Sequence, residues 1–200
     1  VVGIDNHPTN RLTEYTPAKM LNYLDPNDKL LNKFDRAEFI ADDYLSFIVE
    51  ELKPFVDSHY STLGDSANTV VMGSSMGGLI SLYALAEYPD IFGSAACLST
   101  HTPAAIGDFE SAAEPWSKAF RDYLMENLPE ANTRTVYMDY GDGTLDANYA
   151  PFQTQVDALF EAKGWTKPHY VTLLFPGHNH DETSWHKRLH IPLELLLGTE

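Results

Sequence analysis

The sequence contains a single cysteine, Cys97, so an intrachain disulfide is excluded. A lone thiol neither requires a reducing compartment nor excludes the periplasm, so it leaves the localisation open. The sequence also has no run that approaches the roughly 18 apolar residues of a membrane-spanning helix, so no membrane span is predicted. Cys97 lies in the apolar run Ala95–Leu98, which predicts a buried core residue.

Basic residues are scarce: 13 Lys and Arg stand against 29 Asp and Glu, for a formal net charge of −16. A surface of this sign repels phosphate backbones and anionic lipid, so nucleic acid is not an expected partner. Apolar residues are plentiful by contrast, at 44% with 12% aromatic, which excludes a disordered chain. The 200 residues are enough for one domain, over 1–200, with a sizeable core. No initiator Met or signal peptide precedes Val1, and we expect an N-terminal part of the natural protein to be absent.

Short apolar runs without alternation are typical of strands that are buried on both faces of a parallel sheet. Helical patterns lie between them and predict βαβ units, with helices on both faces of the sheet. The predicted strands are Val1–Ile4, Thr69–Met72, Phe92–Leu98, Thr135–Tyr140 and Tyr170–Phe175. The predicted helices are 35–60 (with a kink or end at Pro54), Met76–Tyr88, Asn148–Lys163 and Ser184–Leu197 (interrupted by Pro192). Residues 99–115 lack periodicity and predict a long loop, so a lid is expected over 99–128.

One segment carries a nucleophile motif. Gly73-Ser74-Ser75-Met76-Gly77 matches G-x-S-x-G, with a predicted strand before it and a predicted helix after it. In such an elbow the turn is sharp, and Gly73 and Gly77 are expected to relieve crowding around a strained Ser75. The N–H of Met76, at the helix N-terminus, is expected to point at a developing oxyanion. The alternative is an ordinary Gly/Ser-rich turn that joins a strand to a helix.

A serine hydroxyl needs a base, and the base needs a carboxylate that fixes its tautomer. The chain order for this elbow is Ser, then Asp or Glu, then His. After the strand Thr135–Tyr140, Asp142 and Asp146 both lie on the expected acid loop, whereas Asp139 lies inside the strand. After the last strand, His178 and His180 both lie where the base is needed, and spacing alone does not decide between the members of either pair. The Asp-rich loop is no EF-hand, and His-x-His lacks a third ligand at metal spacing, so no metal is predicted.

Together these segments resemble the putative esterase family of α/β-hydrolases, which includes esterase D, enterochelin esterases, feruloyl and acetylxylan esterases, and the mycolyltransferases. The resemblance covers nearly the whole chain. It is carried by Val2-Gly3-Ile4-Asp5-Asn6, Arg11, Glu14-Tyr15-Thr16-Pro17, Gly73–Leu79, Tyr88-Pro89, Phe92-Gly93, Gly143-Thr144-Leu145-Asp146 and His180–Trp185.

The resemblance implies an α/β-hydrolase fold with a mainly parallel sheet. Its Gly-Thr-x-Asp segment places the acid at Asp146, and its His followed by Trp five positions later places the base at His180. Counting strands back from the elbow, we expect the first three strands of the fold to precede Val1, together with the loop that holds the second oxyanion N–H.

The sequence therefore predicts a carboxylic ester hydrolase that needs no cofactor, with Ser75, His180 and Asp146 as its triad. The expected substrate is a small-molecule or glycan-linked ester. Residues near the carboxyl ends of the strands are expected to bind it, and these are Asp5, Asn6, Arg11, His101 and Trp116. Two rival hypotheses remain: an acyltransferase that uses the same triad, and a non-catalytic binding module on the same fold.

Overall fold

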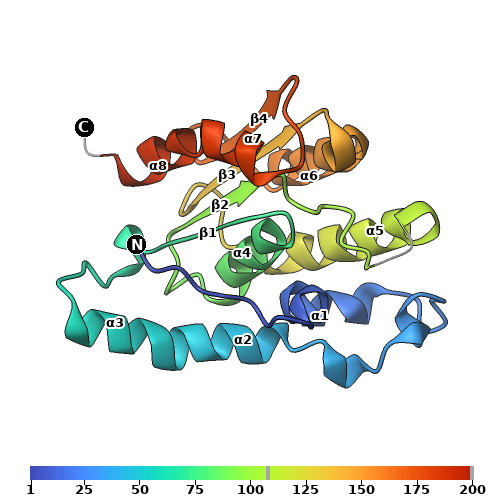
Figure 1. Ribbon diagram of the computed structural model, residues 1–200, viewed down its shortest axis with the longest axis horizontal. Coiled ribbons are helices and arrows are strands. Elements are labelled where there is room, and N and C mark those ends of the chain that lie inside the picture. The colour runs from blue at the N-terminus through green and yellow to red at the C-terminus, as the bar shows by residue number, and fades with distance from the viewer. Residues whose placement is uncertain (107–108, 199–200) are drawn as a thin grey trace.

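A four-stranded parallel sheet lies at the centre of the computed structural model, which describes residues 1–106 and 109–198. Its strands are β1 (Val70–Ser74), β2 (Ser94–Leu98), β3 (Thr135–Gly141) and β4 (Tyr170–Phe175). They lie side by side in chain order, with Ser74 paired to Leu98 and Leu98 to Asp139. Because all neighbours are parallel, the carboxyl ends of the four strands meet at one edge (Figure 1).

Helices surround the sheet and form an additional layer below it (Figure 1). The α-helices are α1 (Arg11–Tyr15), α2 (Ala41–Phe47), α3 (Lys53–His59), α4 (Met76–Glu87), α5 (Phe109–Asn127), α6 (Ala150–Ala162), α7 (Glu182–Arg188) and α8 (His190–Leu197). Short 3-10 helices lie at Ala18–Tyr23, Leu31–Lys33, Arg36–Glu38, Ser66–Asn68 and Thr144–Asn148.

The two faces of the sheet bury different residues because side chains alternate along each strand. Ala95 and Cys97 of β2 face the larger core, which α4, α5 and α6 complete. Ala96 and Leu98 face a smaller cluster, which is closed by side chains of α7 and α8. Helices on both faces of a parallel sheet, as predicted, give the α/β architecture of this chain.

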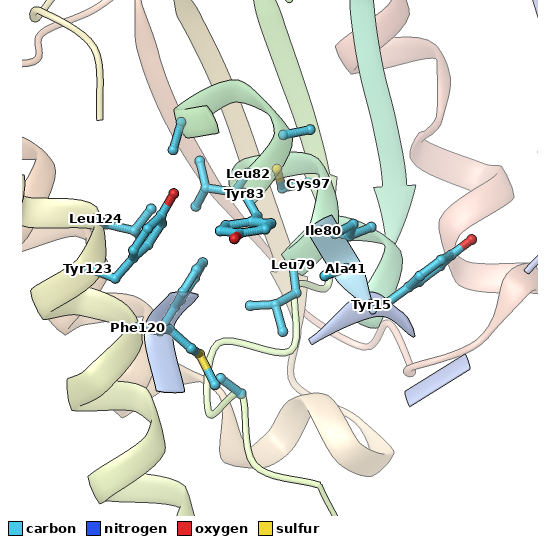
Figure 2. Close-up of a cluster of buried hydrophobic side chains, with 14 of the residues drawn as sticks. Tyr15, Ala41, Leu79, Ile80, Leu82, Tyr83, Cys97, Phe120, Tyr123 and Leu124 are labelled. Carbon is cyan, nitrogen blue, oxygen red and sulfur yellow. The ribbon is translucent and has the colours of Figure 1, made fainter. Parts of the chain in front are cut away.

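The larger core extends beyond the sheet through α4, which is apolar nearly all round and buried along most of its length. Figure 2 shows Leu79, Leu82 and Tyr83 of α4 among side chains from α5 and from the N-terminal helices. Polar contacts join the same layers: the hydroxyl of Tyr83 donates to Asp42 on α2, and Lys19 pairs with Glu87. These contacts pack the N-terminal helices against α4.

Three expectations from the sequence need correction. The predicted strand Val1–Ile4 is an exposed segment without strand pairing. The predicted lid is mostly the helix α5, whose buried stripe includes Trp116, Phe120 and Leu124, and residues 107–108 lie outside the described part of the chain. The predicted helix 35–60 is a 3-10 turn followed by α2, a π-helical turn at Ile48–Leu52, and α3.

The π-helical turn has a local cause in Pro54. Proline has no N–H to donate to the carbonyl four residues earlier, and its ring crowds that carbonyl. The wider turn at Ile48–Leu52 ends just before Lys53 and Pro54, so the helix continues to His59. Pro192 is similar, because it is the third residue of α8, where an N–H has no partner within the helix.

We predict that Cys97 resists thiol reagents as long as the protein stays folded. Its side chain is fully buried, and burial raises the pKa of the thiol far above its ordinary value, so almost no thiolate forms. Ellman's reagent should leave Cys97 unmodified in native buffer and react fully in guanidinium chloride. A His186→Cys variant, which adds a thiol at an exposed position of α7, should react at once and serves as the control. Rapid reaction of the unaltered native protein would contradict this packing.

Candidate active site

Ser75 lies at the turn between β1 and α4 in a backbone conformation that few residues adopt, with φ 58° and ψ −121°. The strain is held in place by hydrogen bonds on both sides, since its N–H donates to the Leu98 carbonyl and its own carbonyl accepts from the N–H of Leu79. Gly73 is required for this turn, because a Cβ there would lie 2.5 Å from the Gly77 backbone. The same prediction for Gly77 is wrong, because a Cβ at that position meets no atom within 4 Å.

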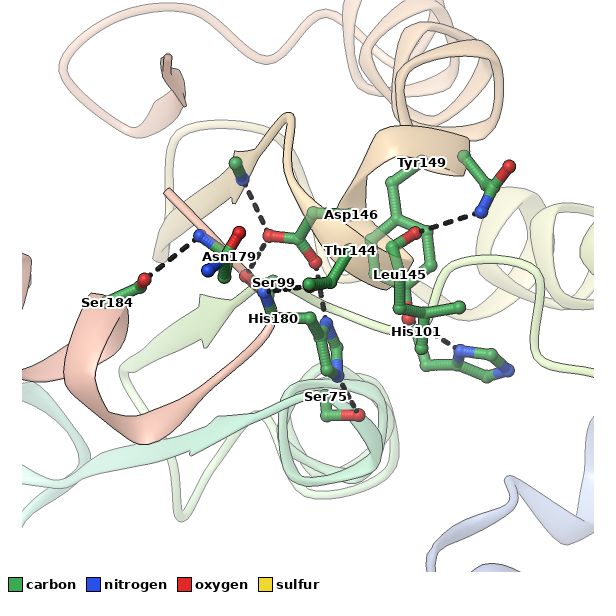
Figure 3. A network of polar contacts seen from close by, with 12 residues as sticks. Ser75, Ser99, His101, Thr144, Leu145, Asp146, Tyr149, Asn179, His180 and Ser184 are labelled. Carbon is green, nitrogen blue, oxygen red and sulfur yellow. Dashed lines mark hydrogen bonds and ion pairs between the residues drawn. The ribbon is translucent and has the colours of Figure 1, made fainter. Parts of the chain in front are cut away.

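His180 lies in the loop after β4 and bridges the serine to a carboxylate. Its Nε2 is 2.9 Å from the Oγ of Ser75, and its Nδ1 is 2.6 Å from Oδ1 of Asp146 (Figure 3). The loop is fixed by a hydrogen bond from the His180 N–H to the hydroxyl of Thr144, at 2.8 Å. Tyr149 and Trp185 contact the imidazole edge-on, with ring centroids 5.5 and 5.1 Å from its own. The ring orientation is thus set by packing as well as by hydrogen bonds.

Asp146 is almost completely buried, on the 3-10 helix that follows β3. Its Oδ2 accepts from the hydroxyl of Ser99 at 2.6 Å and from the N–H of Gly141 at 2.7 Å. Burial by itself raises the pKa of this carboxyl, but the hydrogen bonds from His180, Ser99 and Gly141 outweigh it and hold the pKa below its ordinary value. Asp146 is therefore a carboxylate at neutral pH, in the state that can stabilise a protonated imidazole.

The other candidates for acid and base have different partners. Asp142 is exposed and accepts from the N–H of Gly177 at 2.7 Å. Asp139 is buried and pairs with Arg188 at 2.9 Å, and the Nη1 of Arg188 also lies 3.2 Å from Nδ1 of His178. The geometry thus brings together Ser75, His180 and Asp146 and leaves the alternatives outside this chain of contacts.

Met76 is the first residue of α4, so its N–H has no acceptor within the helix and is available beside Ser75. Among the residues from 1 to 106 and from 109 to 198, no group of three or more His, Cys, Asp and Glu side chains could hold a metal ion. Within the same described residues, no helix is long and apolar enough to cross a membrane.

The predicted substrate-binding residues are scattered. His101 lies nearest to the triad: its Nδ1 is 2.8 Å from the hydroxyl of Tyr149, the residue whose ring packs on His180, and burial lowers the pKa of His101. Asn6 and Arg11 line a groove of about 780 Å³ along the free edge of β1, together with Ser74 and Gly77 of the elbow.

Asp5 is exposed at the same N-terminal segment. Trp116 is fully buried in the larger core, where its Nε1 donates to Asp28 at 3.3 Å and its ring packs on Phe39. Its place in the core follows from the helical period of α5, a segment whose first residues were predicted to form a loop.

Comparison with known proteins shows the family of this chain. The sequence model of the family described as "Putative esterase" matches residues 19–190. The "Uncharacterized protein YbbA" of Bacillus subtilis (strain 168) is 24% identical over 204 residues, which cover 99% of this chain and 73% of the relative.

Solved structures share the fold at low identity. An IroE-like serine hydrolase from Shewanella oneidensis has a TM-score of 0.63 at 19% identity, over 92% of this chain and 55% of its own. A ferulic acid esterase has a TM-score of 0.60 at 19% identity, over 78% of this chain and 61% of its own. The chain thus spans little more than half of the length of these solved structures.

Proposed function

Because the chain belongs to the family described as "Putative esterase", we propose that it is a serine esterase in which Ser75, His180 and Asp146 hydrolyse a carboxylic ester through an acyl-enzyme. The single observation that carries this proposal is the continuous pair of hydrogen bonds from the Ser75 hydroxyl through the imidazole to Asp146. The strained elbow supports it, because strain of this kind persists only where the surrounding structure holds it.

In the proposed reaction, Nε2 of His180 removes the proton of Ser75 as its Oγ attacks the ester carbonyl. Asp146 keeps the other imidazole proton on Nδ1 and stabilises the positive charge that develops on the ring. The N–H of Met76 donates to the oxyanion of the tetrahedral intermediate. The intermediate collapses when His180 gives its proton to the leaving alcohol, and a water activated by the same imidazole then releases the acid from Ser75.

The proposal is tested by hydrolysis of p-nitrophenyl acetate and butyrate, combined with a fluorophosphonate probe and peptide mapping of the labelled site. We expect both esters to be hydrolysed and the probe to attach to Ser75, because its hydroxyl is hydrogen-bonded to an imidazole that is itself held by a buried carboxylate. Ser74→Ala is the matched control, since it removes the neighbouring hydroxyl and leaves labelling intact. A protein that hydrolyses neither ester and resists the probe would reject the proposal in favour of the binding-module hypothesis.

A further inference from the structure

A buried arginine lies behind the carboxylate of Asp146, on the side of the oxygen that His180 does not contact. Nη2 of Arg188, from α7, is 2.7 Å from the hydroxyl oxygen of Ser99, and that hydroxyl is 2.6 Å from Oδ2 of Asp146. Ser99 follows β2 and is fully buried, and Arg188 is only 1% exposed. Three segments that are far apart in the sequence are thus joined in one chain of contacts beneath the triad.

Arg188 is held in place independently of Ser99. The same Nη2 lies 2.9 Å from Oδ1 of Asp139, Nη1 lies 3.2 Å from Nδ1 of His178, and the guanidinium stacks over the ring of Phe175 at 5.1 Å. Asp139 is fixed in turn by the hydroxyl of Tyr137, which donates to its Oδ2 at 2.8 Å. The charged and titratable groups that face Arg188 are therefore Asp139, His178 and, through Ser99, Asp146.

Donor and acceptor rules fix the direction of the Ser99 hydroxyl. A guanidinium group has donors only, so Ser99 Oγ must accept where it meets Arg188. The one hydrogen of that hydroxyl is then free to point at Asp146 Oδ2. The backbone of Ser99 is held as well, because its N–H donates to Asp139 at 3.1 Å while its φ is 40°.

This direction has a consequence for the triad. With donors from both Ser99 and Gly141, Oδ2 of Asp146 is satisfied, and the carboxylate is oriented so that Oδ1 meets the imidazole (Figure 3). Were the hydroxyl to rotate away, Oδ2 would lose a buried donor and the carboxylate could turn.

We propose that Arg188 is a positioning residue for Asp146 and acts through the hydroxyl of Ser99, which it orients toward the carboxylate. This inference rests on the proposed function of the triad. The buried ion pair between Arg188 and Asp139 then also serves the triad, because it holds the guanidinium that orients Ser99. A buried ion pair is by itself a weak source of stability.

The test compares four variants in steady-state hydrolysis of p-nitrophenyl butyrate, each with its thermal unfolding midpoint. Ser99→Ala removes the hydroxyl and keeps the pair of Arg188 with Asp139. Arg188→Lys keeps the positive charge beside Asp139, but its shorter side chain stops short of the position that Nη2 occupies. Thr102→Val is the matched control, because the hydroxyl of Thr102 is fully buried nearby and has no hydrogen-bond partner among the described residues. The fourth variant combines Ser99→Ala with Arg188→Lys.

We expect Ser99→Ala to lower kcat about 10- to 100-fold with KM changed by less than about twofold, the scale of a misplaced catalytic group. Arg188→Lys should lower kcat by a similar factor, and the double variant should lose little more than Ser99→Ala alone, because both changes remove the same directed hydrogen bond. Thr102→Val should keep the kcat of the parent. Multiplied losses in the double variant, or parental kcat in Ser99→Ala, would overturn the proposal.

A second readout does not depend on turnover. The proton between His180 and Asp146 should give a far-downfield proton NMR resonance in the parent and in Thr102→Val, and this resonance should shift or broaden in Ser99→Ala. If the parent fails to hydrolyse esters, the proposed function fails, whereas the resonance still reports whether Ser99 positions Asp146. A resonance that is unchanged in Ser99→Ala would overturn the positioning role even if hydrolysis proceeds.

Discussion

Replacing either Ser75 or His180 by alanine should lower kcat for p-nitrophenyl butyrate by about 10⁴- to 10⁶-fold, and replacing both should cost no more than the larger single loss. The reason is that the two groups act as a unit. Nε2 of His180 lies 2.9 Å from the Ser75 hydroxyl, so a histidine without its serine has no proton to take, and a serine without its histidine has no base.

His186→Ala is the matched control, because His186 is an exposed histidine on α7, one turn beyond the His180 loop. Its kcat should stay within about twofold of the parent, as for most surface substitutions. The measurement is steady-state kinetics with purified variants, with fluorophosphonate labelling to count residual active sites. A His180→Ala variant that keeps more than about a hundredth of the parental kcat would mean that another group serves as the base.

The strands were predictable where the sequence pattern and the pairing agree. β1 to β4 coincide within two residues at each end with apolar runs, because the strands of a parallel sheet with helices on both faces are mostly apolar. The run Val1–Ile4 has the same local character but lies exposed, without the neighbour that would make it a strand. Local composition therefore indicates that a segment favours an extended backbone, and hydrogen bonding to a neighbouring segment decides whether it forms a β-strand.

The helix α5 was not predicted because its helical period is hard to recognise in the sequence. Threonine, proline and glycine residues between 100 and 107 precede this helix and Pro115 lies inside it, and together they mask the period of the buried residues Trp116, Phe120 and Leu124. Proline is tolerated there, inside the helix at Pro115. The cost of a proline inside the helix is outweighed by burial, since this stripe fills the core beside α4.

For the candidate site, the order of strands and motifs along the chain was sufficient to find the loops that carry the acid and the base. It did not decide which aspartate and which histidine of those loops take these roles. Asp142 and Asp146 lie on the same loop, and the 3-10 helix that begins at Thr144 is what turns Asp146 back under the sheet edge. Ser99 and Arg188 were not predicted, because their contact joins positions 89 residues apart. A usable signal existed for Arg188, which lies three residues after Trp185 on the buried side of α7, an unusual place for a charged side chain.

Replacing Asp146 by asparagine should lower kcat about 10⁴-fold, which is the loss seen for the equivalent change in a well-studied serine protease. The asparagine is isosteric, so the geometry should survive while the proton arrangement fails. Oδ2 of Asp146 accepts from Ser99 and from the Gly141 N–H, so the amide oxygen should take that position. The NH₂ group of the asparagine then faces Nδ1 of His180 and donates to it, so the imidazole proton must lie on Nε2. A protonated Nε2 can no longer accept the proton of Ser75.

Asp142→Asn is the matched control, since it makes the same chemical change on the same loop at an exposed carboxylate that contacts Gly177. It should change kcat by no more than about twofold. Both variants should be measured for kcat and KM and for their thermal unfolding midpoints, because a hydrogen bond to a buried charge contributes about 1.5–3 kcal/mol to stability. The inverse result, with Asp142→Asn inactive and Asp146→Asn active, would move the acid of the triad to Asp142. That outcome would require the loop after β3 to rearrange, since Asp146 is the carboxylate that lies 2.6 Å from the His180 ring.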